Sequence, residues 1–187
     1  MAVDPNRVIE LTLPKEFATL LESVHRQHGI TSNIINEPVL ALDPGETTGV
    51  AEFDGDCTIR VYQKVTKDLG QSYDWLIDRL THGPNWSADP NYGPNFPHLR
   101  YEDYRVYEWK AQDHAWSPVH TIRWIGAIQV AAHVTQTPAS CCMAQHAKGW
   151  WTDAKLDHFG LNPKGLKHGR DALRHLLYYL LFPTKVS

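Results

Sequence analysis

The stretch that most constrains the fold is Val39–Asp43, which reads VLALD. Its first four residues are all apolar, and an unbroken apolar run of this length is typical of a β-strand covered on both faces. Such a strand lies inside a sheet that has helices on each side. It ends at a carboxylate, Asp43, and residues 44–49 (PGETTG) then predict a tight turn. The sequence therefore places an acidic side chain at the end of a buried strand.

Predicted strands and helices alternate along the rest of the chain. Residues 49–65 predict two strands joined by a turn at residues 54–56, which together form a β-hairpin. The later elements are a helix around 73–80, a short strand at 98–104, a helix at 117–134, a strand at 139–145 and a helix at 167–182. This order indicates an α/β fold with a mixed five-stranded sheet, an antiparallel meander followed by parallel strands, flanked by helices.

Three segments carry more specific expectations. Residues 1–37 predict a strand and a helix outside the main domain at 38–187, either as an arm or docking element or simply packed on that domain. Residues 82–98 are rich in Pro and Gly and predict a long surface loop. In the helix at 117–134 we expect three isoleucines to face the core: Ile122, Ile125 and Ile128.

Composition limits the class of protein. Apolar residues make up 42% and charged residues 21% of 187 residues, as in a globular domain. The three cysteines lack zinc-ligand spacing, and no segment reads as a signal peptide or a membrane span, so we expect a cytoplasmic protein. The net charge of −3 does not suggest a nucleic-acid binder, but the segment from residue 145 onward is locally basic, which permits polyanion binding.

Acidic side chains stand at the ends of three predicted elements. Asp43 ends the first strand of the meander, and the pair Glu102–Asp103 ends the strand at 98–104. Asp171 lies near the start of the last helix. In a mixed sheet of this order the first and fourth strands can be neighbours, so Asp43 and Glu102 would meet at their carboxyl ends, where α/β sheets bind ligands.

The last helix carries a polar face that would complete this group. His168, Asp171 and His175 are spaced i, i+3 and i+7 and therefore share one side of the helix. The leucines that would anchor the helix form a separate stripe: Leu173, Leu176, Leu177 and Leu180. We expect one cluster of four site residues: Asp43, Glu102, His168 and Asp171. We expect His175 to support packing or to contact a ligand residue instead of binding metal directly.

Clustered carboxylates repel one another unless a cation lies between them. Their hard oxygen atoms favour Mg²⁺ or Mn²⁺, and two such ions about 3.5–4 Å apart can promote hydrolysis of a phosphodiester. Each residue alone also has a structural explanation. Asp43 could cap its turn, Glu102 could be a solvated strand end, and Asp171 could complement the helix dipole, as could His168.

Three motifs in this order resemble RuvC-type Holliday junction resolvases, especially the divergent phage-encoded ones: LDPGETTGVA at 42–51, YEDYRVY at 101–107 and KHGRDALRH at 167–175. The resemblance covers about residues 38–182. It implies an RNase H-like fold, and a homodimer that cuts branched DNA with Mg²⁺ or Mn²⁺, two ions in each active site. If the chain is phage-encoded, it would act in the host cytoplasm.

The resemblance also assigns residues. The aspartate of the family's first strand falls on Asp43, the glutamate of its fourth strand falls on Glu102, and its last-helix pair falls on His168 and Asp171. Under this hypothesis five basic residues would contact phosphates: Lys148, Lys155, Lys167, Arg170 and Arg174. Trp150 and Trp151 could stack on unpaired bases, although core packing is the better explanation for at least one of them.

Other functions remain compatible with the sequence. A different nuclease of the same fold, acting on flaps, replication intermediates or RNA–DNA hybrids, would need the same residues. Actin-like ATPases and sugar kinases also start with a D-x-G-x-T turn, but they need a second such domain, and 187 residues contain no second copy. A non-catalytic DNA-binding or structural protein of this fold would not need all four site residues.

Overall fold

The computed structural model describes residues 7–31, 37–82, 98–103 and 117–183. Most of the predicted loop at 82–98 lies outside the described residues. In chain order the elements are β1 (Ile9–Thr12), α1 (Lys15–His28), β2 (Val39–Asp43), β3 (Thr47–Phe53), β4 (Thr58–Val65), α2 (Leu69–His82), β5 (His98–Asp103), α3 (Ser117–Val134), β6 (Ala139–Met143), α4 (Ala144–Trp150), α5 (Asp153–His158) and α6 (Lys167–Leu181).

One mixed sheet runs through the molecule in the order β1-β4-β3-β2-β5-β6. β2, β3 and β4 form the predicted antiparallel meander, whereas β5 is parallel to β2 and β6 is parallel to β5. The prediction of five strands is wrong because β1 adds a sixth strand. It pairs antiparallel with β4, from Ile9 opposite Val61 to Thr12 opposite Thr58, and its alternating exposure suits an edge strand.

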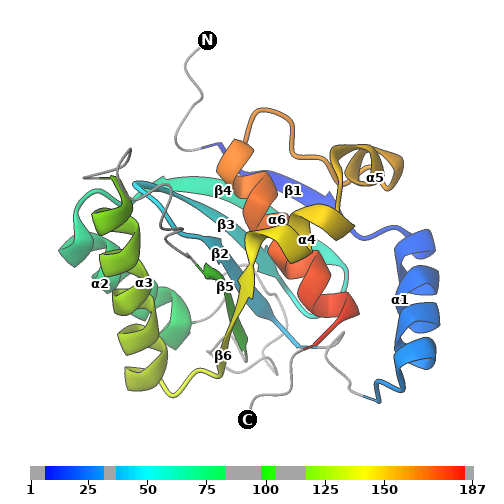
Figure 1. Ribbon diagram of the computed structural model, residues 1–187, viewed down its shortest axis with the longest axis horizontal. Helices are drawn as coiled ribbons and strands as arrows, with labels where there is room; N and C mark the ends of the chain where they lie inside the picture. The colour runs from blue at the N-terminus through cyan, green and yellow to red at the C-terminus, as the bar shows by residue number, and fades with distance from the viewer. Residues whose placement is uncertain (1–6, 32–36, 83–97, 104–116, 184–187) are drawn as a thin grey trace.

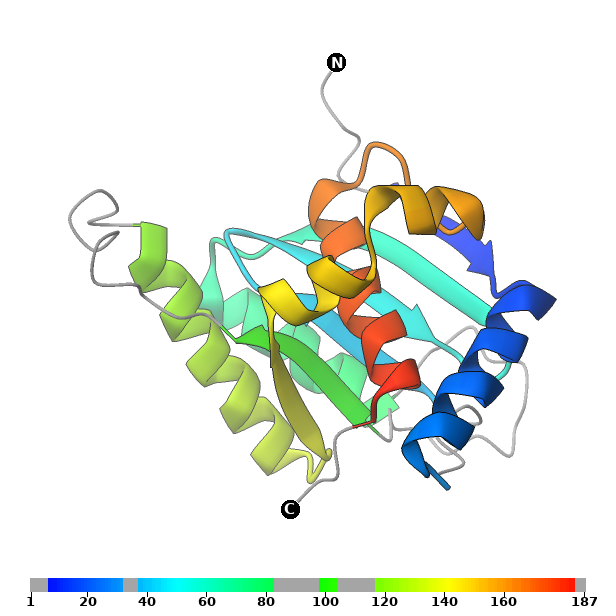
Figure 2. The same ribbon diagram turned by 45° about the vertical axis from the view of Figure 1, so that its right-hand side comes forward.

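Helices cover both faces of the sheet (Figure 1). α2 and α3 pack together on one face, and α6 crosses the other face, where it contacts β2, β3, β4 and β5. Figure 2 shows α6 lying across the front of the sheet, with α4 and α1 on either side of it. This arrangement explains why β2 is buried along its whole length.

The side chains of β2 divide between the two cores. Val39 and Ala41 belong to the apolar cluster on the side of α1 and α6, whereas Leu40 and Leu42 belong to the cluster on the side of α2 and α3. Successive side chains of a strand point to opposite faces. Asp43 continues the first series and therefore points toward α6.

The N-terminal segment packs on the same framework. Phe17, Leu21 and Val24 of α1 are buried in the cluster that α6 helps to form. His25 is buried, and its Nε2 lies 2.8 Å from the carbonyl oxygen of Leu180 in α6. The division into an extension at 1–37 and a domain at 38–187 stays a prediction.

α3 faces the sheet differently from the sequence-based expectation. Trp124 and Ile128 are fully buried, but Ile122 is 48% exposed. Residues spaced by three advance about 300° around a helix, so Ile122, Ile125 and Ile128 drift off a single face. The exposed side of α3 carries four large apolar side chains: Val119, Ile122, Val130 and Val134. Neither α3 nor another helix in the described ranges combines the length and the hydropathy of a membrane span.

Candidate active site

Asp43 and Glu102 lie close together because their strands are parallel neighbours. β2 and β5 are in register up to the pair Leu42–Tyr101, so the next residues, Asp43 and Glu102, follow it at the carboxyl ends. Alternation along each strand turns both carboxylates toward the face that α6 covers. The sequence-based expectation for the neighbouring first and fourth strands of the domain is confirmed.

The start of α6 approaches the sheet next to Asp43. Asp43 pairs with Gly49 of β3, and a Cβ atom at position 49 would lie only 1.9 Å from the carbonyl oxygen of His168. Only glycine leaves room for the helix backbone at this point. The backbone N–H of His168 also donates a hydrogen bond of 2.9 Å to Oε1 of Gln63 in β4. These contacts fix the first turn of α6 beside the carboxylates.

His168 makes the direct contact with Asp43. Its Nδ1 lies 2.9 Å from Oδ2 of Asp43, and this hydrogen bond raises the pKa of the imidazole although partial burial acts in the opposite direction. Burial raises the pKa of Asp43, and the charges of Glu102 and Asp171 add to this effect. The hydrogen bond from His168 does not fully offset these causes. Asp43 is therefore a buried carboxyl group in a locally acidic environment.

Glu102 is held from the other side by His175. Nε2 of His175 lies 2.9 Å from Oε2 of Glu102, and the histidine is completely buried. Burial alone would raise the pKa of Glu102, but the hydrogen bond from His175 and the charge of Lys148 outweigh it, so the pKa is lowered. The surroundings thus favour the ionised form of Glu102 more strongly than that of Asp43.

Lys148 places a positive charge among the acids. Its Nζ atom lies 3.1 Å from Oδ2 of Asp171 and 3.6 Å from Oε2 of Glu102. Burial lowers the pKa of Lys148, but the two carboxylates outweigh it and the pKa is raised. Lys148 comes from α4, which packs against α6. An ammonium group therefore joins acids that come from β5 and α6.

The donor set of this cluster fits a hard divalent cation. Asp43, Glu102 and Asp171 offer carboxylate oxygens from three elements, and His168 adds an imidazole nitrogen. The other two acids raise the pKa of Asp43, which indicates that an added cation would be favourable. Within the described ranges, no three His, Cys, Asp or Glu side chains are arranged so that they could already hold a metal ion together. Lys148 engages two of the three carboxylates and would have to give way to a metal ion.

The turn after Asp43 is held by internal hydrogen bonds. The hydroxyl groups of Thr48 and Thr66 lie 2.8 Å apart, and both donate to the carbonyl oxygen of Gly45. Nε1 of Trp124 in α3 donates to Oγ1 of Thr48 at 2.9 Å. The hydroxyl groups of the turn therefore form hydrogen bonds within the protein. This favours a turn that fixes the position of the Asp43 carboxylate over a turn that binds phosphate.

Arg170 and Arg174, two of the five basic residues predicted to contact DNA, lie on α6 and form ion pairs within the protein. Arg174 is only 8% exposed, pairs with Asp171 and Asp153, and donates from Nε to the carbonyl oxygen of Trp151 at 2.8 Å. The guanidinium group of Arg174 is therefore bound within the protein and joins α6 to the segment that contains Trp151 and Asp153. It is not available for the predicted contact with DNA. Nη1 of Arg170 lies 3.3 Å from Oδ2 of Asp153 and is partly exposed.

Two other predicted DNA contacts, Lys155 and Lys167, are exposed, whereas Lys148 lies among the acids. Nζ of Lys155 lies 4.3 Å from the centre of the Trp150 ring, a cation–π contact. Trp151 is fully buried and stacks on Phe17 of α1. Trp151 is thus the tryptophan of the pair that serves core packing.

The sequence did not indicate two contacts of the site, those of Lys148 and Gln63. Lys148 was expected at phosphates, but it pairs with Glu102 because α4 follows β6 directly along the sheet edge. His175 was expected to support packing or to contact a ligand residue, and its hydrogen bond to Glu102, one of the predicted ligands, agrees with the second of these alternatives. Gln63 carries no sequence signal, because its contact depends on how α6 packs on β4.

Comparison with known proteins supports the fold assignment. No family model matches the chain, and no curated protein sequence matches it. Among solved structures, T. thermophilus RuvC in complex with a Holliday junction substrate has a TM-score of 0.54 and 15% identity, over 78% of this chain and 94% of that chain. A second Thermus thermophilus RuvC structure has a TM-score of 0.53 and 16% identity, with the same coverage. The predicted resemblance is therefore confirmed at the level of the fold, and the chain has the RNase H-like α/β fold of RuvC.

Proposed function

We propose that this protein is a metal-dependent endonuclease that cuts branched DNA, with four-way Holliday junctions as its substrate. The observation that carries the proposal is the convergence of Asp43, Glu102 and Asp171 from β2, β5 and α6 on a RuvC-like fold. The charges of Glu102 and Asp171 raise the pKa of Asp43, so a cation among the three carboxylates would stabilise their ionised forms.

The proposed ligands are Asp43, Glu102, His168 and Asp171, and the proposed cofactor is Mg²⁺ or Mn²⁺, two ions in each site. Bound there, the ions would neutralise the carboxylates and supply an activated water together with charge stabilisation at the leaving oxygen. The chain contributes the positions. His168 orients Asp43 and His175 orients Glu102, and Lys148 occupies the space between Glu102 and Asp171 that a metal ion would take over.

Contacts with DNA phosphates would come from the exposed basic groups near the site. Lys155, Lys167 and the partly exposed Arg170 surround the start of α6 and the α5 segment. Such contacts add affinity without reading sequence, and the affinity falls as salt rises. Arg174 is not part of this proposal because its guanidinium group is engaged internally.

Cutting a four-way junction symmetrically requires two active sites, so the proposal includes a homodimer. The exposed side of α3 offers a surface for a second copy of the chain, because Val119, Ile122, Val130 and Val134 are between 41% and 61% exposed there. A stripe of large apolar side chains along one helix face is the kind of surface that symmetric dimers bury.

A different nuclease of the same fold would use the same site, so the substrate decides between the candidates. The experiment compares wild type and Asp43→Asn on four-way junction, flap, duplex and RNA–DNA hybrid substrates with Mg²⁺ or Mn²⁺. We expect paired symmetric nicks in the junction, lost in Asp43→Asn and retained in the control Asp74→Asn, which changes an exposed acid on α2. Equal cutting of all four substrates would contradict the junction assignment. A folded dimer that cuts none of them would contradict the nuclease itself.

A further inference from the structure

Lys148 of α4 brings a positive charge into the proposed metal site. Its Nζ atom lies 3.1 Å from Oδ2 of Asp171 and 3.6 Å from Oε2 of Glu102, so one ammonium group joins acids from α6 and β5. Its charge also opposes the rise in the pKa of Asp43, the third acid of the site. A hard divalent cation would bind to the same carboxylate oxygens. The ammonium group and a metal ion therefore compete for them.

Asp171 also pairs with Arg174, but the two cations differ in their freedom to move. The guanidinium group of Arg174 is buried and is bound as well to Asp153 and to the carbonyl oxygen of Trp151. The side chain of Lys148 is 39% exposed, so its four-carbon stem can turn toward solvent while the core stays closed. Lys148 is therefore the cation that can leave Asp171, whereas Arg174 stays.

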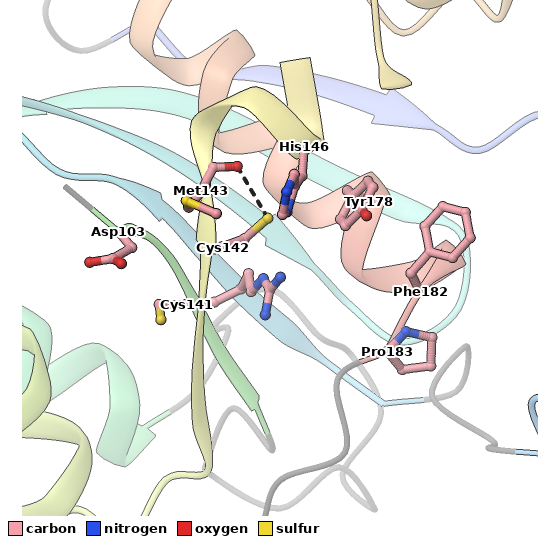
Figure 3. A pocket seen from close by; sticks show the side chains of 9 residues that line it. Asp103, Cys141, Cys142, Met143, His146, Tyr178, Phe182 and Pro183 are labelled. Carbon is pink, nitrogen blue, oxygen red and sulfur yellow. Dashed lines mark hydrogen bonds between the residues drawn. The ribbon is translucent and has the colours of Figure 1, made fainter. Parts of the chain in front are cut away.

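The backbone that carries Lys148 is fixed by neighbouring residues of α4. Figure 3 shows the ring of His146 beside that of Tyr178 in α6, and their centres lie 6.4 Å apart. At the end of α4, the rings of Trp150 and Phe182 meet edge to face with their centres 5.1 Å apart. These contacts hold α4 against α6. A metal ion that enters the site therefore displaces the side chain of Lys148 and leaves the helix in place.

Histidines hold two of the three acids independently of Lys148. Nδ1 of His168 lies 2.9 Å from Oδ2 of Asp43, and Nε2 of His175 lies 2.9 Å from Oε2 of Glu102. In the described part of the chain, no three side chains of the metal-binding types are already arranged to hold an ion together. The fold thus places the acids near one another, but they are grouped around an ammonium group, which has to leave before a metal ion can contact all of them.

We propose that Lys148 is a tethered counter-ion of this site: it holds Glu102 and Asp171 together while no metal is bound, and a divalent cation has to displace it. Lys148 then stabilises the metal-free protein and weakens metal binding by the same factor, because the free energy that is lost on displacement enters both equilibria. The inference rests on the proposed function for the presence of a metal site. It adds to that function a residue that sets how tightly the site binds metal.

The experiment uses the full chain, in wild type and in Lys148→Met, which keeps a long unbranched side chain and removes the charge. Electron paramagnetic resonance measures the Mn²⁺ dissociation constant, and urea unfolding measures stability with and without Mn²⁺. We expect Lys148→Met to bind Mn²⁺ roughly three- to tenfold more tightly, the size expected for two partly exposed ion pairs. Without metal it should unfold at a lower urea concentration than wild type, and at saturating Mn²⁺ this difference should disappear.

Lys164→Met is the matched control, since it removes the same charge from an exposed lysine that precedes α6. Nζ of Lys164 lies 4.0 Å from Oδ1 of Asp157, outside the proposed site, so the Mn²⁺ affinity should not change. A second measurement does not require that Lys148→Met folds. ¹⁵N NMR observes the lysine ammonium groups of wild type, and the Lys148 signal is identified by its absence in Lys148→Arg. This signal should shift when diamagnetic Mg²⁺ is added.

Equal or weaker Mn²⁺ binding by Lys148→Met would overturn the inference, as would a Lys148 ammonium signal that Mg²⁺ leaves unchanged. A loss of stability that persists at saturating Mn²⁺ would show a merely structural role, and an equal gain of affinity in Lys164→Met would show a general effect of charge. Failure of the proposed function looks different: both proteins would bind Mn²⁺ with the expected ratio of affinities, but wild type would cut no junction. If neither protein binds Mn²⁺, the metal site and the inference are both wrong.

Discussion

At the scale of single residues, the pKa values of Asp43 and Glu102 are shifted in opposite directions although both residues end neighbouring strands. Burial and two nearby acids raise the pKa of Asp43, whereas His175 and Lys148 lower that of Glu102. His168 is the residue that ties Asp43 to the start of α6. This hydrogen bond makes part of the folding stability depend on pH.

We expect the substitution His168→Gln to remove the pH-dependent part of the folding stability that comes from the hydrogen bond to Asp43. The hydrogen bond to Asp43 raises the pKa of His168 above its ordinary 6.5, so its contribution is complete below about pH 6.5 and is lost as the pH rises through the raised value. Without metal, the free energy of unfolding of wild type should exceed that of His168→Gln by about 1 kcal/mol near pH 6. The difference is small because the histidine is partly exposed, and the two free energies should converge toward pH 9. Urea unfolding at several pH values measures this, with His158→Gln as an exposed control. A difference independent of pH would contradict the assignment.

At the scale of elements, the site depends on how closely α6 approaches β3. The carbonyl oxygen of His168 fills the space that a side chain at position 49 would need, and Gly169 likewise leaves no room against Val61 and Tyr62. Two glycines on facing elements therefore set the distance between the helix that carries Asp171 and the strand that carries Asp43. A larger residue at either position would separate them.

Gly49→Ala should accordingly disturb both stability and metal binding. The added Cβ would meet backbone atoms that cannot rotate away, so we expect a loss of about 3 kcal/mol in the free energy of unfolding. Chemical denaturation measures the loss. Gly149→Ala in α4 is the control, because nothing lies within 4 Å of its new Cβ and alanine favours a helix. Equal stability of the two variants would show that α6 does not need this close approach.

Local patterns predicted the elements well, and long-range packing accounts for what they missed. The apolar run of β2, the turn at 54–56 and the spacing of His168 and Asp171 depend on neighbours in the chain, so they could be read directly. The pairing of β1 with β4 joins segments about fifty residues apart, and the sequence carries no register signal for it. The position of Lys148 between two acids depends equally on the packing of α4 against α6.

At the scale of the whole molecule, α6 and α3 have opposite surroundings. α6 is buried between the sheet, α4 and α1, whereas α3 covers the other face together with α2 and leaves an apolar stripe exposed. The proposed active site lies on the α6 side of the sheet. A dimer formed through the exposed stripe of α3 would therefore not cover the proposed active site, which lies on the other face of the sheet.

We expect the charged substitution Val130→Glu to convert the proposed dimer into monomers. The side chain lies within the exposed stripe of α3, and burying an unpaired carboxylate there would be costly, so the dimer dissociation constant should rise at least about 100-fold. Sedimentation velocity measures the change. Val65→Glu alters an equally exposed valine at the end of β4 and should leave the oligomeric state unchanged. A wild-type protein that is monomeric at micromolar concentration would contradict the dimer.

The proposed function depends on acids from β2, β5 and α6 that together form one site for divalent cations. The most direct measurement is Mn²⁺ binding, followed by electron paramagnetic resonance, in wild type and in three single variants: Asp43→Asn, Glu102→Gln and Asp171→Asn. The control is Asp103→Asn, which alters the acid beside Glu102 that alternation turns to the opposite face of β5. We expect each of the three variants to bind Mn²⁺ at least about tenfold more weakly, while Asp103→Asn binds like wild type. Unchanged affinity in the three variants would contradict the proposed site.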